Sequence, residues 1–108
     1  MSLTFDDLRK ANTNRQKEWE TSSKLDLSYL GNAAAGEMGE TCNVIKKLER
    51  ERLGLTGSRA TKRELADELA DTLIYLDLIA NRAGINLGEA VRKKYNDTSA
   101  KYGFEERL

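Results

Sequence analysis

The sequence contains no proline and no histidine, and its only cysteine is Cys42. Without proline, nothing in the chain forces a helix to break. One cysteine cannot form an internal disulfide, and one cysteine without histidine excludes the usual zinc sites. Because disulfides are the usual benefit of an oxidising compartment and this chain cannot form an internal one, we expect a reducing, cytoplasmic setting. With no histidine available as a base, we expect Cys42 to be a small buried apolar residue and not a nucleophile.

The sequence also lacks long apolar runs and an excess of either charge. No stretch approaches the roughly 18 apolar residues of a membrane-spanning helix, and residues 1–10 lack the apolar core of a signal peptide. Eighteen basic residues balance eighteen acidic ones, so no net charge draws the chain to nucleic acid or to an anionic membrane. Residues 92–101, RKKYNDTSAK, give the only support for nucleic-acid binding, and the absence of a broad basic face argues against it.

Helical periodicity fills most of the chain. At 108 residues the sequence has the length of a single domain. Four helices are predicted, over residues 4–20, 26–53, 61–83 and 86–103, and Gly54, Gly84 and Gly103 mark the ends of the last three. Thr4, Thr61 and Asn86 are each followed three residues later by Asp or Glu, as at helix N-termini. We therefore expect an all-α fold.

Two pairs of carboxylates interrupt the apolar stripes of the two long central helices. In GEMGETCNVIKKL (residues 36–48), Glu37 lies in the middle of the stripe and Glu40 at its edge. In ELADELADTLIYLDLIA (residues 64–80), Glu68 and Asp71 have the same arrangement. If the two helices pack antiparallel, the four carboxylates converge on one small volume.

Three interpretations of these carboxylates are open. A solvated charged face explains most charged stretches, but a buried carboxylate is costly unless it is paired or bound to a cation. Pairing would require Lys47, beside Glu40, or Arg82. A metal site of oxygen ligands alone would suit Mg²⁺ or Mn²⁺. A di-iron bundle site requires histidine and is excluded, and no EF-hand loop is present.

A magnesium site built from carboxylates points to a phosphorylated substrate, because Mg²⁺ usually completes its shell with phosphate oxygens and water. Lys93, Lys94 and Asn96 form a compact cluster that could hold phosphate. The alternative is that these lysines only interact with the dipole at the carboxyl end of their helix.

These motifs together resemble the MazG-like all-α nucleoside triphosphate pyrophosphohydrolases. The resemblance runs from GEMGETCNV through ELADELADTLIYLDLIA to KKYN, and covers residues 14–103. It implies a four-helix MazG-like bundle in which Glu37, Glu40, Glu68 and Asp71 are catalytic and bind Mg²⁺. It also implies that Tyr75, Asn96 and Lys93 or Lys94 contact the nucleotide, and that Trp19, within EWE, stacks on the base. Core packing is the alternative for Trp19. Thr41 and Cys42 depart from the family, which we interpret as variation in the core.

The resemblance implies hydrolysis of a nucleoside or deoxynucleoside triphosphate to the monophosphate and pyrophosphate. It also implies a dimer or tetramer. The sequence supports association independently, because the third predicted helix is apolar on two faces, with Leu65, Leu69 and Leu76 opposite Ile74 and Leu78. The alternative is a non-catalytic helical oligomeric interaction module, which explains the apolar faces but leaves the inward carboxylates without a role.

Overall fold

The computed structural model describes residues 2–19 and 25–108, and all of its regular structure is helical. The four helices are α1 (Phe5–Glu18), α2 (Leu27–Arg52), α3 (Lys62–Arg82) and α4 (Leu87–Tyr102). The prediction of an all-α fold is therefore confirmed for this part of the chain. None of the described helices has both the length and the apolar character needed to cross a membrane.

Side-chain caps define where the helices begin. Thr4 forms a reciprocal capping box with Asp7, whose carboxylate accepts from the backbone amide of Thr4. Thr61 and Asn86 accept hydrogen bonds from the amides of Glu64 and Glu89. Each cap satisfies an amide that has no partner within its helix. At the other end of α4, Gly103 adopts a left-handed conformation, with φ of 70°, which glycine accepts without a steric penalty.

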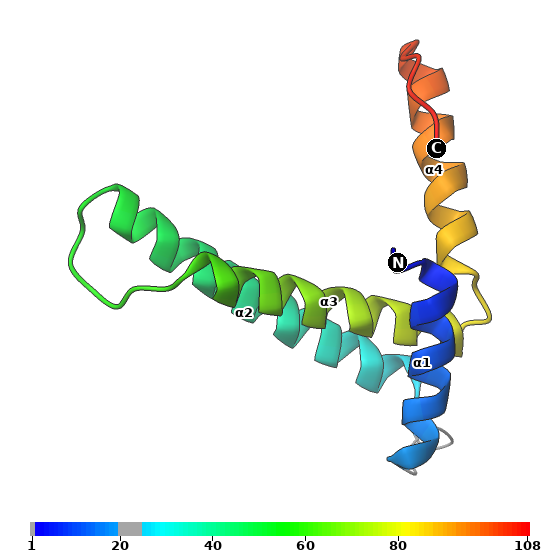
Figure 1. The fold of residues 1–108 in the computed structure, drawn as a ribbon, viewed down its shortest axis with the longest axis horizontal. Helices are drawn as coiled ribbons and strands as arrows, with labels where there is room; N and C mark the ends of the chain where they lie inside the picture. Colours follow the sequence, from blue (N-terminus) through cyan, green and yellow to red (C-terminus); the bar gives the residue numbers. More distant parts are fainter. Residues whose placement is uncertain (1, 20–24) are drawn as a thin grey trace.

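Helices α2 and α3 form a long antiparallel hairpin, and α1 crosses the base of α3 (Figure 1). The buried side chains of α2 are Leu30, Ala34, Thr41 and Val44, so the predicted inward stripe of this helix is confirmed. Thr41 is completely buried. Its Oγ1 lies 3.2 Å from Oγ1 of Thr72 and fixes the register of the hairpin.

A buried polar network attaches α1 to α3. The side chain of Asp77 is only 1% exposed and accepts hydrogen bonds from Arg9 Nε, at 3.2 Å, and Asn12 Nδ2, at 2.9 Å. Arg9 also donates to the carbonyl of Ile85 in the α3–α4 connection. Because a buried charge is tolerated only when it is paired and hydrogen-bonded, this network fixes where α1 sits.

Helix α4 extends away from the hairpin and packs only against α1 and α3 (Figure 1). The radius of gyration is consequently 17.0 Å, whereas a compact domain of this length has about 13 Å. The accessible surface of 8131 Å² likewise exceeds the roughly 6,000 Å² typical of a folded monomer of this mass. One chain alone thus does not close its four helices around a single core.

Candidate metal centre and adjoining pocket

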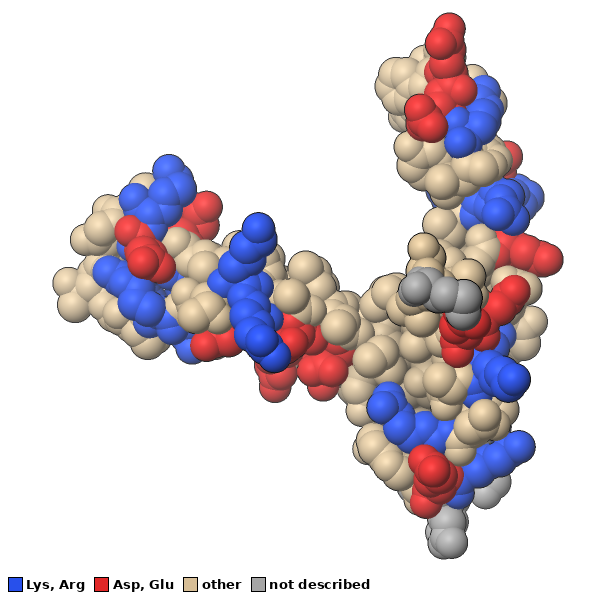
Figure 2. Space-filling view, viewed as in Figure 1, with Lys and Arg blue, Asp and Glu red and all other residues tan. Residues whose placement is uncertain are grey.

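Three of the four predicted carboxylates come together on one side of the hairpin. Glu37, Glu40 and Glu68 each offer an oxygen, and these oxygens lie within 4.8 Å of one another. Figure 2 shows acidic side chains gathered along one edge of the hairpin, nearer its junction with α1 than its loop end. We call Glu37, Glu40 and Glu68 the glutamate cluster. Oxygen ligands at this spacing suit a hard cation such as Mg²⁺.

The buried oxygens of the cluster lack hydrogen-bond partners. Oε2 of Glu37 and Oε2 of Glu68 are both shielded from solvent and accept no hydrogen bond from any described residue. Lys47, the candidate partner for Glu40, forms no ion pair in the described part of the chain. Pairing with Lys47 therefore does not explain the inward carboxylates, whereas a bound cation would supply the missing partner.

Two members of the cluster, Glu37 and Glu68, have raised pKa values. Burial, followed by the negative charges of Glu40 and Asp71, raises the pKa of Glu37 above its usual value. Burial likewise raises the pKa of Glu68, with further contributions from the adjacent carboxylate of Glu40 and from the charges of Glu37 and Asp71. The like charges of neighbouring carboxylates thus disfavour ionisation of Glu37 and Glu68. A divalent cation would reverse this effect.

Asp71 lies beside the cluster, in a pocket of about 290 Å³ that it lines together with Glu37. The pocket is closed by the end of α1 and by α3, and its other lining residues are Arg15, Gln16, Trp19, Ile74, Tyr75 and Leu78. The structure thus places Tyr75 and Trp19, both predicted from the resemblance, next to the carboxylates. Burial raises the pKa of Tyr75, as do the nearby Tyr29, Glu37 and Asp71.

Trp19 is 60% exposed, so core packing does not account for it. The guanidinium of Arg15, one turn earlier on α1, lies 5.7 Å from the centre of the Trp19 ring. Sequence reasoning missed Arg15 because a charged residue on an amphipathic helix gives no signal of its own. Only the crossing of α1 over α3 brings it to the pocket.

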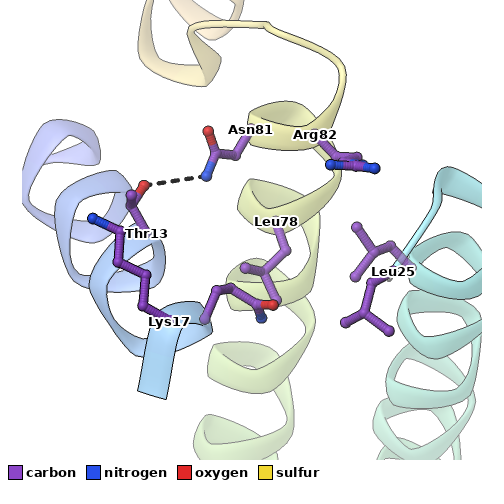
Figure 3. A pocket seen from close by; sticks show the side chains of 8 residues that line it. Thr13, Lys17, Leu25, Leu78, Asn81 and Arg82 are labelled. Atoms are coloured by element: carbon purple, nitrogen blue, oxygen red, sulfur yellow. Dashed lines mark hydrogen bonds between the residues drawn. The ribbon is translucent and has the colours of Figure 1, made fainter. Parts of the chain in front are cut away.

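A second cavity, of about 220 Å³, lies between α1, α3 and Leu25 (Figure 3). Asn81 Nδ2 donates to Thr13 Oγ1 across it, at 3.2 Å. Among the described residues, its lining includes the cations Lys17 and Arg82 and no carboxylate, and it shares Gln16 and Leu78 with the pocket beside Asp71. Its described lining therefore contributes no carboxylate ligand to the cluster.

The remaining predicted residues, on α4, do not reach the cluster within one chain. Helix α4 has no packing contact with α2. Lys93 forms an ion pair with Asp97 at 2.6 Å, which raises the pKa of Lys93 and lowers that of Asp97. Asn96 bonds the backbone of Leu108, accepting from its amide at 2.8 Å and donating to its carbonyl at 3.3 Å.

The prediction that Cys42 is buried was wrong, because Cys42 is exposed. It belongs to a continuous apolar face of the hairpin, formed by Met38, Cys42 and Ile45 on α2 and by Leu69, Leu73 and Leu76 on α3, all of them exposed. We call this the outer apolar face. On the helical wheel, the three α2 residues of this face lie about 140° or more from Glu40. The three α3 residues lie equally far from Asp71. The hairpin thus has an acidic side and an apolar side.

A search against models of protein families found no match to this chain, and a search of curated proteins found none either.

Proposed function

We propose that this chain is a Mg²⁺-dependent nucleoside triphosphate pyrophosphohydrolase, with Mn²⁺ as an alternative metal. The observation that carries the proposal is the glutamate cluster, with two buried oxygens that have no hydrogen-bond partner among the described residues. The donor set fits the metal, since it consists of closely spaced oxygens with a formal charge that no described cation neutralises. Glu37, Glu40 and Glu68 would hold the ion, with Asp71 close enough to join them.

The adjoining pocket supports a nucleotide as the substrate. Trp19 and Tyr75 offer aromatic faces on which a base or sugar can pack, and they line the same pocket as Glu37 and Asp71. Base stacking on aromatic side chains is favourable for every base, so the pocket itself does not select one. Either an NTP or a dNTP is compatible with this arrangement.

The reaction needs positioning and charge neutralisation more than covalent chemistry. A water oxygen attacks the α-phosphorus, and the bond from that phosphorus to the bridging oxygen breaks. The electron pair leaves with pyrophosphate, and the proton of the water passes to a carboxylate. Glu40 is the candidate for this base because it is exposed while its neighbours in the cluster are half-buried. A bound Mg²⁺ supplies charge neutralisation of the phosphates and a lowered pKa of water.

The outer apolar face supports association into a dimer or tetramer. Six exposed apolar side chains on adjacent helices form a larger patch than isolated surface residues do. The accessible surface exceeds that of a typical monomer by about 2,000 Å², which is enough to form a stable interface. Packing two hairpins through this face would also complete a four-helix bundle. The same observation favours our alternative function, a non-catalytic helical oligomeric interaction module.

The two functions are separated by measuring Mg²⁺-dependent pyrophosphate release from a panel of NTPs and dNTPs. Glu68→Gln should lower turnover of the best nucleotide about a hundredfold or more, because it removes a charge that holds the ion. Its metal-free melting temperature should hold or rise, since one of several repelling carboxylates is removed.

Asp67→Asn is the matched control, because Asp67 is the adjacent, exposed acid and lies outside the cluster. It should retain normal turnover. Near-normal turnover in Glu68→Gln together with a clearly lower melting temperature would show that Glu68 is a structural ion-pair partner. No turnover of any nucleotide by the unmodified protein would favour the interaction module.

A further inference from the structure

Lys47 differs from the other lysines that the structure describes. It is half-buried on α2, whereas the others, Lys10, Lys17, Lys46, Lys62, Lys93, Lys94 and Lys101, are exposed. The aliphatic part of a lysine can pack on apolar surface while its ammonium stays in water. Burial alone therefore gives Lys47 no role, and its charge and position decide the matter.

The ammonium of Lys47 has no partner within the described ranges. Two other basic side chains there are half-buried, and both are hydrogen-bonded: Arg9 to Asp77, and Arg50 to the carbonyl of Ser58. Lys47 makes no hydrogen bond and no ion pair with any described residue. The ammonium of Lys47 therefore gains no stabilising ion pair or hydrogen bond from the described residues, and it is available to an anionic ligand.

The position of Lys47 relates it to the glutamate cluster. Seven residues separate it from Glu40, so the two lie within about 20° on the helical wheel and about 10.5 Å apart along the axis. Long side chains on a helix lean toward its amino end, and from Lys47 that direction leads toward Glu40. The outer apolar face lies on the opposite side of the hairpin.

Three features thus follow one another along the acidic side of the hairpin. The pocket lined by Trp19, Tyr75 and Glu37 lies at the α1 end, the glutamate cluster follows, and Lys47 lies beyond it toward the loop. The parts of a nucleoside triphosphate match these features in the same order. The flat base suits the aromatic pocket, the metal-binding phosphate chain suits the glutamate cluster, and the anionic terminal phosphates suit Lys47.

We propose, on the basis of the function proposed above, that Lys47 binds the β- and γ-phosphates of the nucleotide. The base then lies toward α1 and the terminal phosphates toward the α2–α3 loop. As the bond to the α-phosphorus breaks, the bridging oxygen takes the electron pair, and negative charge develops on the departing pyrophosphate. The ammonium of Lys47 stabilises this charge within the same chain, whereas Lys93 is paired with Asp97 on a helix that does not contact α2.

The test compares Lys47→Gln with Lys46→Gln, which removes the same charge from the adjacent, exposed lysine on the far side of the helix. Lys47→Gln should lower kcat/KM at least about tenfold, as expected for loss of one group that stabilises developing charge. Inhibition by pyrophosphate should weaken by a similar factor, while inhibition by the nucleoside monophosphate should not change. Lys46→Gln should match the unmodified protein, and Lys47→Arg should restore most of the lost activity.

Titration calorimetry with magnesium pyrophosphate gives a readout that does not depend on turnover. The unmodified protein should bind pyrophosphate more tightly than Lys47→Gln does, with equal melting temperatures for the two lysine-to-glutamine variants. Equal pyrophosphate affinity in both variants would overturn the role of Lys47. Equal weakening of pyrophosphate and monophosphate inhibition would overturn the proposed orientation. If pyrophosphate binding depends on Lys47 but no nucleotide is hydrolysed, the anion site at Lys47 would be supported and the proposed pyrophosphohydrolase activity would be overturned.

Discussion

The hydroxyl oxygens of Thr41 and Thr72 lie 3.2 Å apart across the contact between α2 and α3. Each hydroxyl also lies within hydrogen-bond distance of a backbone carbonyl four residues earlier on its own helix, Thr41 near Glu37 and Thr72 near Glu68. Because each hydroxyl has a single hydrogen, one of the two can donate across the contact while the other donates to its own helix. The contact therefore joins two residues that hold the same position relative to a cluster glutamate. It sets the register in which Glu37 and Glu68 face each other.

Thr41→Val should destabilise the fold by about 1 kcal/mol, because it removes a buried hydroxyl from this contact while nearly keeping the side-chain volume. The double variant Thr41→Val/Thr72→Val should cost less than the sum of the two single variants, since neither side then keeps an unpaired group. Chemical denaturation measures both. Thr56→Val, at an exposed position in the α2–α3 loop, should have little effect, and strict additivity would show that the two hydroxyls do not interact.

The raised pKa values of Glu37 and Glu68 predict how the stability of the metal-free protein changes with pH. Both groups bind protons more tightly when folded than when unfolded. Their contribution to stability is therefore fully present below the usual glutamate pKa, and it is lost as the pH rises through the raised values.

The melting temperature of the unmodified protein, relative to that of Glu68→Gln, should thus fall as the pH rises above 4.5, the usual glutamate pKa. Thermal melts in a chelating buffer measure this difference, in which the titration of exposed groups common to both proteins cancels. A difference that is independent of pH would show that Glu68 titrates normally.

Mg²⁺ without nucleotide should stabilise the protein only modestly, because water or phosphate would complete much of the ion's shell. At ten times the dissociation constant, the gain in unfolding free energy is about 1.4 kcal/mol. Thermal melts across a magnesium titration measure it, and Glu68→Gln should reduce the shift. A metal-free protein that is unfolded at room temperature would instead indicate a structural metal.

Leu73→Glu should disrupt the oligomer, because Leu73 is the central one of the three α3 residues in the outer apolar face and is 40% exposed in the single chain. Light scattering at micromolar concentration should show a dimer or tetramer for the unmodified protein and a smaller species for the variant. Leu55→Glu is the control, at a 55% exposed position in the α2–α3 loop. A clean monomer for the unmodified protein would contradict the proposed association.

Helical periodicity predicted the acidic side of the hairpin well. Glu37, Glu40 and Glu68 could be assigned to one volume because the position of a residue on a helix follows directly from its number. Antiparallel packing then brings the two stripes together. The helix caps at Thr4, Thr61 and Asn86 could be predicted equally well, since each depends on residues only three apart in the sequence.

The direction of α4 and the exposure of Cys42 could not be predicted in this way. Periodicity identifies a face of a helix but not what covers it, so Cys42 was expected to be buried, whereas the structure exposes it. The placement of α1 depends on Asp77, whose partners Arg9 and Asn12 are more than sixty residues away in sequence. Such a network gives no local signal, and the approach of Arg15 to the pocket follows from it.

The sparse packing of α4 gives the chain two levels of local stability. Local unfolding of α4 breaks few apolar contacts, whereas unfolding of the hairpin breaks the whole packed interface between α2 and α3 around Thr41. Regions with few tertiary contacts open at a lower free energy than the cooperative core. Amide protons of α4 should therefore exchange with solvent well before those of α2 and α3, unless an assembled partner covers that helix. Helix α4 can thus rearrange on assembly or on ligand binding while the helices that carry the glutamate cluster stay folded.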